Sequence, residues 1–340
     1  MAKYCMKVLC IFIVMVLGLQ LTACGQEAEA TDTTGIRERR YAWPLGTSSP
    51  EDTVTQLYAV KFAEEVERLS DGKMRINIFS NGTIGNDKEL LESCRDGDIP
   101  FVVQNTAPQV SFMPKLAVFD IPAAFSSIED ARKAIDNQDF YDKIYGVYGE
   151  EGYKLLGIAD QGFRVMTTNK RIERIEDFRG QKIRTMDNSN HLEFWKSIGA
   201  NPTPMAFSEV YIGLQQNTID AEENPLEVIV SGKLYEQQKY VIKTNHLPHF
   251  ITLIVSDEFF QTLNEEEQDV ILQAADTAKK YARIQADERI QNRLDIMAEF
   301  GVEIIELPDD VFVEMQRRSQ DLYDRIISET DAELVNHYIN

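Results

Sequence analysis

Cysteine, tryptophan and long apolar runs are all scarce in this sequence. Its 340 residues include four cysteines and two tryptophans. Beyond the N-terminal segment, no stretch reaches the roughly 18 consecutive apolar residues of a membrane-spanning helix. Cys5 and Cys10 lie in a segment that we expect to be removed on export, which leaves Cys24 and Cys94. We expect Cys24 to be modified, so Cys94 has no disulfide partner and is predicted to be a small core residue.

The first residues have the features of an export signal. Lys3 and Lys7 make a basic start, and residues 8–21 form an apolar core that is too short for a comfortable membrane span. The following "LTACG" resembles the lipobox of bacterial lipoproteins. Residues 1–23 are therefore predicted to be a lipoprotein signal peptide, with Cys24 carrying the palmitate-bearing lipid anchor. A plain secretory signal with a chance cysteine is the alternative.

Residues 24–39 are small, polar and charged, which is typical of a flexible tether. The predicted location is the outer side of the cytoplasmic membrane, with membrane contact through the lipid only.

The chain has 56 acidic and 35 basic residues and a formal net charge of −21. Such an acidic chain is a poor binder of nucleic acid, and we predict no nucleic-acid partner. A bound anion would need local positive charge.

Signatures of the common catalytic classes are absent. There is no Gly-x-Ser-x-Gly, no phosphate-binding Gly-x-x-x-x-Gly-Lys, no Gly-x-Gly-x-x-Gly and no His-Glu-x-x-His. His246 and His249 are three residues apart, but no cysteine or third histidine lies close to them in the sequence, so neither a metal site nor a cofactor is predicted. We therefore expect a protein that is not an enzyme.

Strand-like and helix-like segments alternate, and the pattern restarts near residue 160. This alternation predicts an α/β fold with mostly parallel sheets and helices on both faces. The expected strands are 40–45, 73–79, 100–104, 153–158, 163–167 and 181–186, and the expected helices are 50–69, 87–95, 127–149, 175–178 and 188–198.

One long helix is predicted late in the chain. Residues 263–300 contain no glycine or proline, Asn264 and Glu267 form a plausible capping pair, and Gly301 ends the run. About 36 residues of helix extend roughly 54 Å, which is longer than one lobe of ordinary size. We expect this helix to span two lobes, with two shorter helices joined at a kink as the alternative.

Two arginines lie within predicted apolar strands, Arg164 in "GFRVMTT" and Arg184 in "QKIRTM". A guanidinium in such a place must reach solvent, pair with an acid or face a crevice, where its planar fork matches a carboxylate. Periodicity alone favours a structural ion pair for either residue.

Three segments resemble the solute-binding proteins of TRAP transporters, the tripartite ATP-independent periplasmic uptake systems. They are "GFRVMTTNKRI", "IEDFRGQKIRT" and "GANPTPMAFSEVYIGLQQNTIDAEENPL", and the resemblance extends over roughly residues 40–305. It implies a two-lobed periplasmic-binding-protein-like fold (type II-like) with the long helix spanning both lobes. We place lobe I at 40–161 plus about 250–285, and lobe II at 162–249 plus about 286–340.

The resemblance also implies ligand contacts, which come over residue by residue. Arg184 matches the arginine that clamps the ligand carboxylate, Arg164 a second arginine of the cleft, and Asn224 an amide that binds the same carboxylate. Phe207 matches an apolar wall. Asp220, Glu222 and Glu223 are expected at the rim.

Polar side chains of the first lobe are the candidates for selectivity. Thr47 with Ser48 and Ser49 follows the first strand, and Gln104 with Asn105 ends another; Asp187 and His249 are further candidates. Solvated loop-end positions are the alternative for all of them.

The predicted function is that of a receptor which delivers a small organic carboxylate to the integral membrane subunits of a TRAP transporter. A sugar acid such as a uronate or aldonate is the expected ligand. An aromatic or small keto acid is the alternative if Trp43, Trp195 and Phe163 face the cleft rather than the core. A surface-anchored enzyme acting on acidic sugars is the alternative of another class.

Overall fold

The computed structural model describes residues 41–339. The predicted signal peptide, the lipidation site Cys24 and the tether lie outside the described residues. Between residues 41 and 339, no helix is long and apolar enough to cross a membrane.

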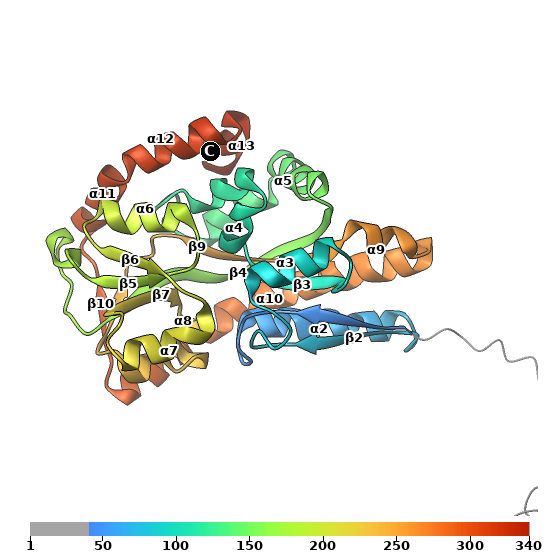
Figure 1. Ribbon diagram of the computed structural model, residues 1–340, viewed down its shortest axis with the longest axis horizontal. Coiled ribbons are helices and arrows are strands. Elements are labelled where there is room, and N and C mark those ends of the chain that lie inside the picture. The colour runs from blue at the N-terminus through green and yellow to red at the C-terminus, as the bar shows by residue number, and fades with distance from the viewer. Residues whose placement is uncertain (1–40, 340) are drawn as a thin grey trace, which may run out of the picture. The chain divides into compact units, whose positions relative to one another are not determined.

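A ten-stranded mixed sheet forms the centre of the described chain (Figure 1). Its main path runs β2-β1-β3-β9-β4-β7-β5-β6, and β8 joins β4 and β10 beside it. The strands are β1 Tyr41–Gly46, β2 Met74–Phe79, β3 Phe101–Asn105, β4 Tyr153–Thr168, β5 Lys182–Thr185, β6 Asn201–Pro204, β7 Ala221–Pro225, β8 Tyr240–Lys243, β9 Pro248–Ser256 and β10 Glu303–Glu306.

Strand β4 joins the two halves of this sheet. Its first residues pair with β9, whereas Arg164–Thr168 pair with β7, and the register slips between Asp160 and Phe163. We call β1, β2, β3, β9 and the start of β4 the first sheet section, and the end of β4 with β5–β8 and β10 the second. This confirms the two-lobed α/β fold. The prediction of separate strands at 153–158 and 163–167 is wrong, because the chain continues through the slip as one strand.

The pairing directions explain how the sections are built. Strands joined through helices are parallel, as in β1–β2, β1–β3 and β5–β6. The two long strands β4 and β9 run antiparallel to each other and to their other partners β3, β7 and β8. The sheet is therefore mixed rather than mostly parallel, since the connections between sections reverse the chain direction. The predicted lobe boundaries stay predictions.

Helices flank both sections. Around the first lie α2 Val54–Leu69, α3 Asp87–Arg95, α4 Ile128–Asp136, α5 Gln138–Glu150 and α9 Asp257–Thr262, with short 3-10 turns η1 Ala107–Ser111 and η2 Pro114–Asp120. The single helix predicted at 127–149 is two helices. Asn137 ends α4 and its side chain caps α5 by accepting a hydrogen bond from the backbone of Phe140.

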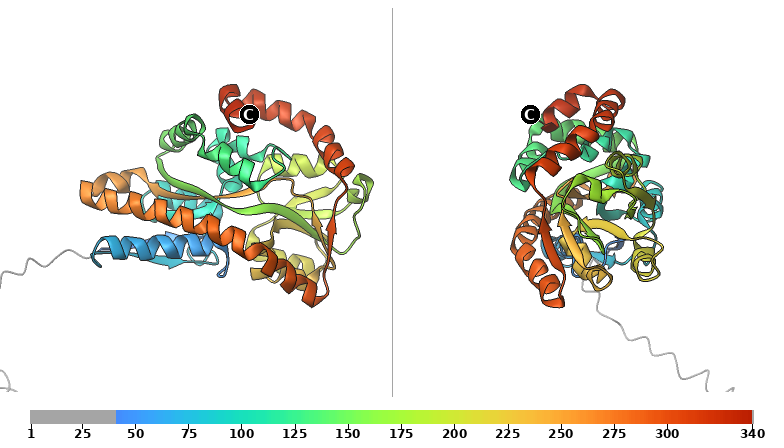
Figure 2. Two further views of the ribbon diagram at one scale, coloured as in Figure 1. Left: turned by 180° about the vertical axis from the view of Figure 1, so that it is seen from behind. Right: turned by 90° about the vertical axis from the view of Figure 1, so that its left-hand side faces the viewer.

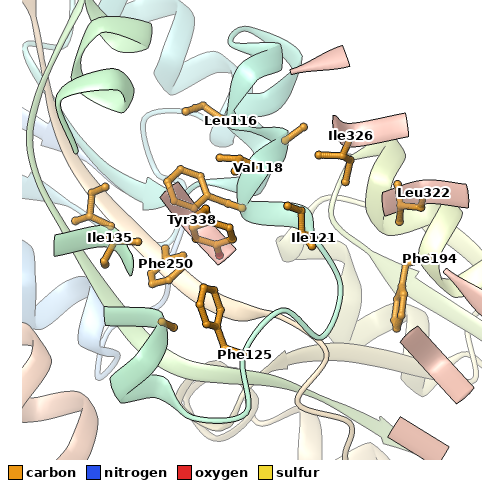
Figure 3. Close-up of a cluster of buried hydrophobic side chains, with 14 of the residues drawn as sticks. Leu116, Val118, Ile121, Phe125, Ile135, Phe194, Phe250, Leu322, Ile326 and Tyr338 are labelled. Atoms are coloured by element: carbon orange, nitrogen blue, oxygen red, sulfur yellow. The ribbon is translucent and has the colours of Figure 1, made fainter. Parts of the chain in front are cut away.

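The second section carries η3 Ile175–Phe178, α6 Ser189–Ser197, α7 Phe207–Gln215, α8 Leu226–Ser231 and η4 Leu234–Gln237, and the chain ends in α11 Asp309–Arg318, α12 Gln320–Glu329 and α13 Ala332–Ile339. Helix α13 returns to α4 and α5, where Tyr338 stacks on Phe140. Tyr338 also meets Phe125 edge-on (Figure 3). Leu322 and Ile326 of α12 belong to the same apolar cluster. The C-terminal helices therefore close the largest core of the described chain.

Helix α10, Glu265–Phe300, is continuous over 36 residues, as predicted. The Asn264–Glu267 capping box begins it, and Gly301 ends it with a φ of 101°. Its buried face is rich in alanine, and its first part packs on α2 and β4 while its end reaches α8 and β10 (Figure 2). Small side chains permit close approach, so one helix supports both sheet sections.

Candidate functional site

A cavity of about 600 Å³ lies between residues of both sheet sections. Such a volume suits a small organic molecule. The first section contributes the loop after β1, the turn before α3 and the start of α3, and the second contributes the end of β5 and the start of α7. The lining residues are Ser48, Asn81, Gly82, Asn86, Asp87, Lys88, Pro108, Arg184, Met186, Asp187 and Pro204–Glu209.

Arg184 is the buried cation of this cavity. It lies in β5 with only 3% of its surface exposed, and its Nε and Nη2 donate to the carbonyl oxygen of Met205 at 3.0 and 2.7 Å. Its Nη1 has no hydrogen-bond partner among the described residues. A buried donor without a partner costs free energy, so this N–H is suited to an acceptor that enters the cavity.

The charge of Arg184 persists at neutral pH. Burial lowers the pKa of the guanidinium to about 10, and the nearby carboxylate of Glu223 opposes that shift. A group with this pKa is almost fully protonated at pH 7. The cavity therefore presents fixed positive charge to an anion.

Arg164 lies in a buried ion pair, and it is not among the residues that line the cavity. Its Nε and Nη2 donate to the carboxylate of Glu223, and Nη2 also reaches the Asn224 Oδ1 at 3.3 Å. Its Nη1 lies 2.6 Å from Nδ1 of His249. Every guanidinium nitrogen of Arg164 has a protein partner, which is the structural ion pair that periodicity favoured. Its ligand contact stays a prediction.

Strand β7 is buried at every residue, because it lies between β4 and β5. Asn224 donates to Oε2 of Glu222 at 2.7 Å, and Thr167 donates to Oε1 of the same carboxyl at 2.6 Å. The expectation that Glu222 and Glu223 lie at the rim is wrong, since both have no exposed surface. Asp220 is partly exposed and accepts from the Lys182 backbone at 3.0 Å.

A charged network surrounds Glu223, and no local sequence pattern indicates it. His246 Nε2 lies 3.1 Å from Glu223 Oε2, and His191 Nε2 lies 3.1 Å from Asp120 Oδ1. Burial alone would lower the pKa of His191, but the hydrogen bond to Asp120 raises it to about 9. Opposite charges and hydrogen bonds hold the pKa of Glu223 well below its usual range against the effect of burial. Among residues 41–339, no cluster of His, Cys, Asp or Glu could hold a metal ion.

The other predicted site residues divide into two groups. Phe207 and Asp187 line the cavity with Arg184, and Asp187 pairs with Lys88 at 2.6 Å. Asn224, Gln104, Thr47 and His249 are buried but not among the lining residues. The Gln104 carboxamide has no hydrogen-bond partner within the described chain, whereas Thr47 accepts from the Ser49 backbone at 3.2 Å. The ligand roles of all these residues stay predictions.

Aromatic side chains contribute little to the cavity wall. Trp195 is fully buried against Phe178 and Phe194, and Trp43 packs between Tyr41 and Phe259. Phe163 lines a separate, smaller cavity. Phe207 is therefore the one aromatic side chain among the described residues that line the main cavity.

Asp87 is a lining residue that the sequence reasoning missed. Ser48 donates to its Oδ1 at 2.5 Å, and burial raises the pKa of the Asp87 carboxyl. The capping box of Asn86 and Glu89 places Asp87 at the start of α3, facing the cavity. That capping pattern is readable in the sequence, but its position opposite Arg184 depends on the tertiary fold.

Comparisons with known proteins show the family of this chain. Residues 45–330 match DctP, the bacterial extracellular solute-binding protein family 7. The 2,3-diketo-L-gulonate-binding periplasmic protein YiaO of Escherichia coli is 28% identical over 84% of this chain and 86% of its own length.

Two solved structures have the same fold. The sugar acid binding protein DctPAm of Advenella mimigardefordensis, in complex with galactonate, has a TM-score of 0.85 and 29% identity over 88% of this chain and 97% of its own. A TRAP periplasmic solute binding protein of a Polaromonas species, bound to D-erythronate, has a TM-score of 0.84 and 30% identity over 88% of this chain and 98% of its own. The chain belongs to the DctP family, whose members are the solute-binding proteins of TRAP transporters.

Proposed function

We propose that this protein binds a small sugar acid, a uronate or an aldonate, in the cavity between its sheet sections and delivers it to a TRAP permease. The observation that carries the proposal is Arg184: its guanidinium is buried, charged and in contact with the cavity, and its Nη1 has no hydrogen-bond partner among residues 41–339. A ligand carboxylate supplies the missing acceptor.

The expected binding free energy suits a receptor that binds its ligand reversibly. A charge-assisted hydrogen bond contributes about 1.5–3 kcal/mol, and a micromolar complex requires about 8 kcal/mol in total. The rest of the binding free energy comes from apolar ligand surface buried against Phe207 and from polar contacts to the ligand. These contributions must also offset the entropy that is lost when the ligand and the side chains become ordered. Galactonate in DctPAm and D-erythronate in the Polaromonas protein support a polyhydroxy acid as the ligand class.

The other predicted ligand contacts fall into two groups in this proposal, one that lines the cavity and one that is buried next to it. Asp187 takes part at the cavity surface, where it already pairs with Lys88. Arg164, Asn224, Gln104, Thr47 and His249 form the buried group, and they reach the ligand after small side-chain adjustments. Closure of the two lobes over the ligand brings the cavity-lining and the buried side chains into contact with it.

The N-terminal predictions complete the proposed setting. Cys24 carries the lipid anchor, and the protein works on the outer side of the cytoplasmic membrane. Its protein partners are the integral membrane subunits of the transporter.

A hydrolytic or lyase function has less support. The family consists of transport receptors. An enzyme needs a positioned nucleophile or an acid–base pair, and the described lining residues include serines and carboxyl groups but no histidine or cysteine.

A thermal-shift screen tests the proposal. The purified protein is mixed separately with galactonate, galacturonate, pyruvate, benzoate and the uncharged polyol galactitol, because a ligand that binds the native state raises the melting temperature. Sugar acids should give the largest shifts, and galactitol should give none. A shift with galactitol equal to that with galactonate would contradict the carboxylate requirement. Larger shifts with benzoate or pyruvate would favour the aromatic or keto-acid alternatives. Mass spectrometry of galactonate recovered from the protein tests the enzyme alternative, and it should show no turnover.

A further inference from the structure

Four charged side chains form a cluster away from the main cavity, at Asp52, Glu227, Arg289 and Arg293, which we call the Asp52 cluster. Asp52 lies in the loop between β1 and α2, Glu227 in α8, and both arginines in α10. The formal charges of the cluster sum to zero. None of its members lines the cavity that contains Arg184.

Asp52 makes four contacts to the helix α10. Its Oδ1 accepts from Arg289 Nη2 at 2.6 Å, and its Oδ2 accepts from Arg293 Nη2 at 2.9 Å. Its backbone carbonyl accepts from the same two groups at 2.9 and 3.1 Å. A network with several shared hydrogen bonds holds its geometry better than an isolated surface pair.

Glu227 shares both arginines with Asp52. The Nε atoms of Arg289 and Arg293 each donate to Glu227 Oε1 at 2.9 Å. Glu227 of α8 and Arg293 of α10 are almost fully buried, so their contact is shielded from solvent. Next to it, the Ser231 hydroxyl of α8 donates to the backbone carbonyl of Glu51.

These contacts join a loop of the first sheet section to a helix that follows a strand of the second. The loop between β1 and α2 contains both Asp52 and Ser48, which lines the cavity, and α8 begins directly after Pro225, the last residue of β7. The cluster also borders the small cavity beside Gly162, where the register of β4 slips between the two sheet sections. Asp52 and Glu227 thus belong to segments of different sheet sections, and the two arginines connect them.

We propose that Asp52 is a positioning residue for ligand retention, which fastens the loop of Ser48 to α8 through Arg289 and Arg293 and so keeps the lobes closed over the ligand. The inference rests on the proposed function, because it concerns the closed state of the same site. Asp52 does not touch the ligand, and its effect is on the lifetime of the complex.

The backbone at Asp52 permits a clean test. Its φ is 59°, in the left-handed region, where asparagine is well tolerated. Asp52→Asn therefore removes the charge without adding strain, and it leaves the Glu227–arginine contacts in place. Asp71→Asn is the matched control, since Asp71 also has a positive φ, 51°, and lies in an exposed turn.

The experiment measures association and dissociation rates of galactonate by stopped flow, with the full chain. Asp52→Asn should raise the dissociation rate about fivefold and change the association rate less than about twofold, because retention rather than access is affected. The melting temperature without ligand should stay close to that of the wild type. Asp71→Asn should match the wild type in all three measurements.

Arg289→Gln separates this role from a general structural one. If Asp52 acts through the helix, Asp52→Asn in the Arg289→Gln background should raise the dissociation rate less than it does in the wild type. An unchanged dissociation rate in Asp52→Asn would overturn the inference and leave the proposed function intact. A wild type that binds no acid overturns the proposed function, and the inference falls with it.

Discussion

Arg184 combines three properties that rarely occur together in one side chain. It is almost fully buried, it keeps its charge at neutral pH, and one of its N–H groups has no partner within the described chain. Two other nitrogens are held by the Met205 carbonyl, so the free Nη1 has a fixed position. A donor that is already oriented loses little entropy when an acceptor arrives.

Substitution of Arg184 tests its proposed role. Arg184→Ala should weaken galactonate binding tenfold or more in calorimetry, because the charge-assisted contact is lost. Arg184→Lys should recover only part of the loss, since an ammonium cannot hold the Met205 carbonyl and the ligand in one planar fork. Arg179→Ala is the control, because Arg179 is exposed just before β5. Equal affinity in Arg184→Ala and the wild type would remove Arg184 from the site.

Residue-level prediction succeeded where a side chain conflicted with its local surroundings. An arginine inside an apolar strand needs a reason, and Arg164 forms the ion pair that periodicity favoured. For Arg184 that prediction is wrong, because its guanidinium donates to the Met205 carbonyl instead. It failed for Glu222 and Glu223, whose charge indicated a rim position. Their burial depends on the position of β7 between β4 and β5, which is set by strand order and not by neighbouring residues.

At the level of elements, β7 carries Glu222 and Glu223 and pairs with β5, the strand that carries Arg184. Glu222 pairs in register with Arg184 across β5 and β7, and burial raises the pKa of its carboxyl to about 7 against the hydrogen bonds from Thr167 and Asn224. Deprotonation of Glu222 therefore places a second negative charge near the ligand carboxylate.

This pKa predicts pH-dependent binding. Between pH 8 and pH 6, Glu222 gains a proton while a sugar-acid carboxylate stays ionised, so affinity should rise by about threefold to tenfold as the pH falls. His191 does not mask the effect, because its pKa of about 9 keeps it protonated over most of this range. Calorimetry of Glu222→Gln should give a smaller change in affinity over this range than the wild type, with the remaining change coming from the Glu227 carboxyl, whose pKa burial also raises to about 7. A flat profile in the wild type would contradict the prediction.

Element boundaries were predictable where capping residues mark them. Asn264, Glu267 and Gly301 define α10 in the sequence and in the structure. The split between α4 and α5 was missed, although Asn137 could have indicated it as a capping residue. The continuity of β4 was not predictable, because Gly162 within the slip is typical of a turn and only the pairing with β9 and β7 shows a single strand.

For the whole molecule, family resemblance and alternation of elements predicted the two-lobed fold. They did not predict the mixed sheet or the return of the C-terminal helices, because both depend on contacts between residues far apart in the chain. Tyr338 meets Phe125 and Phe140 about 200 residues earlier in sequence. No local pattern in residues 332–339 indicates those partners.

A crystal structure of the protein with galactonate tests the central claim most directly. The ligand carboxylate should lie within hydrogen-bond distance of Arg184 Nη1, with the sugar chain directed toward Ser48 and Asp87 on the other side of the cavity. A galactonate molecule bound in this cavity with its carboxylate away from Arg184, and with Nη1 paired to a protein acid, would contradict the account.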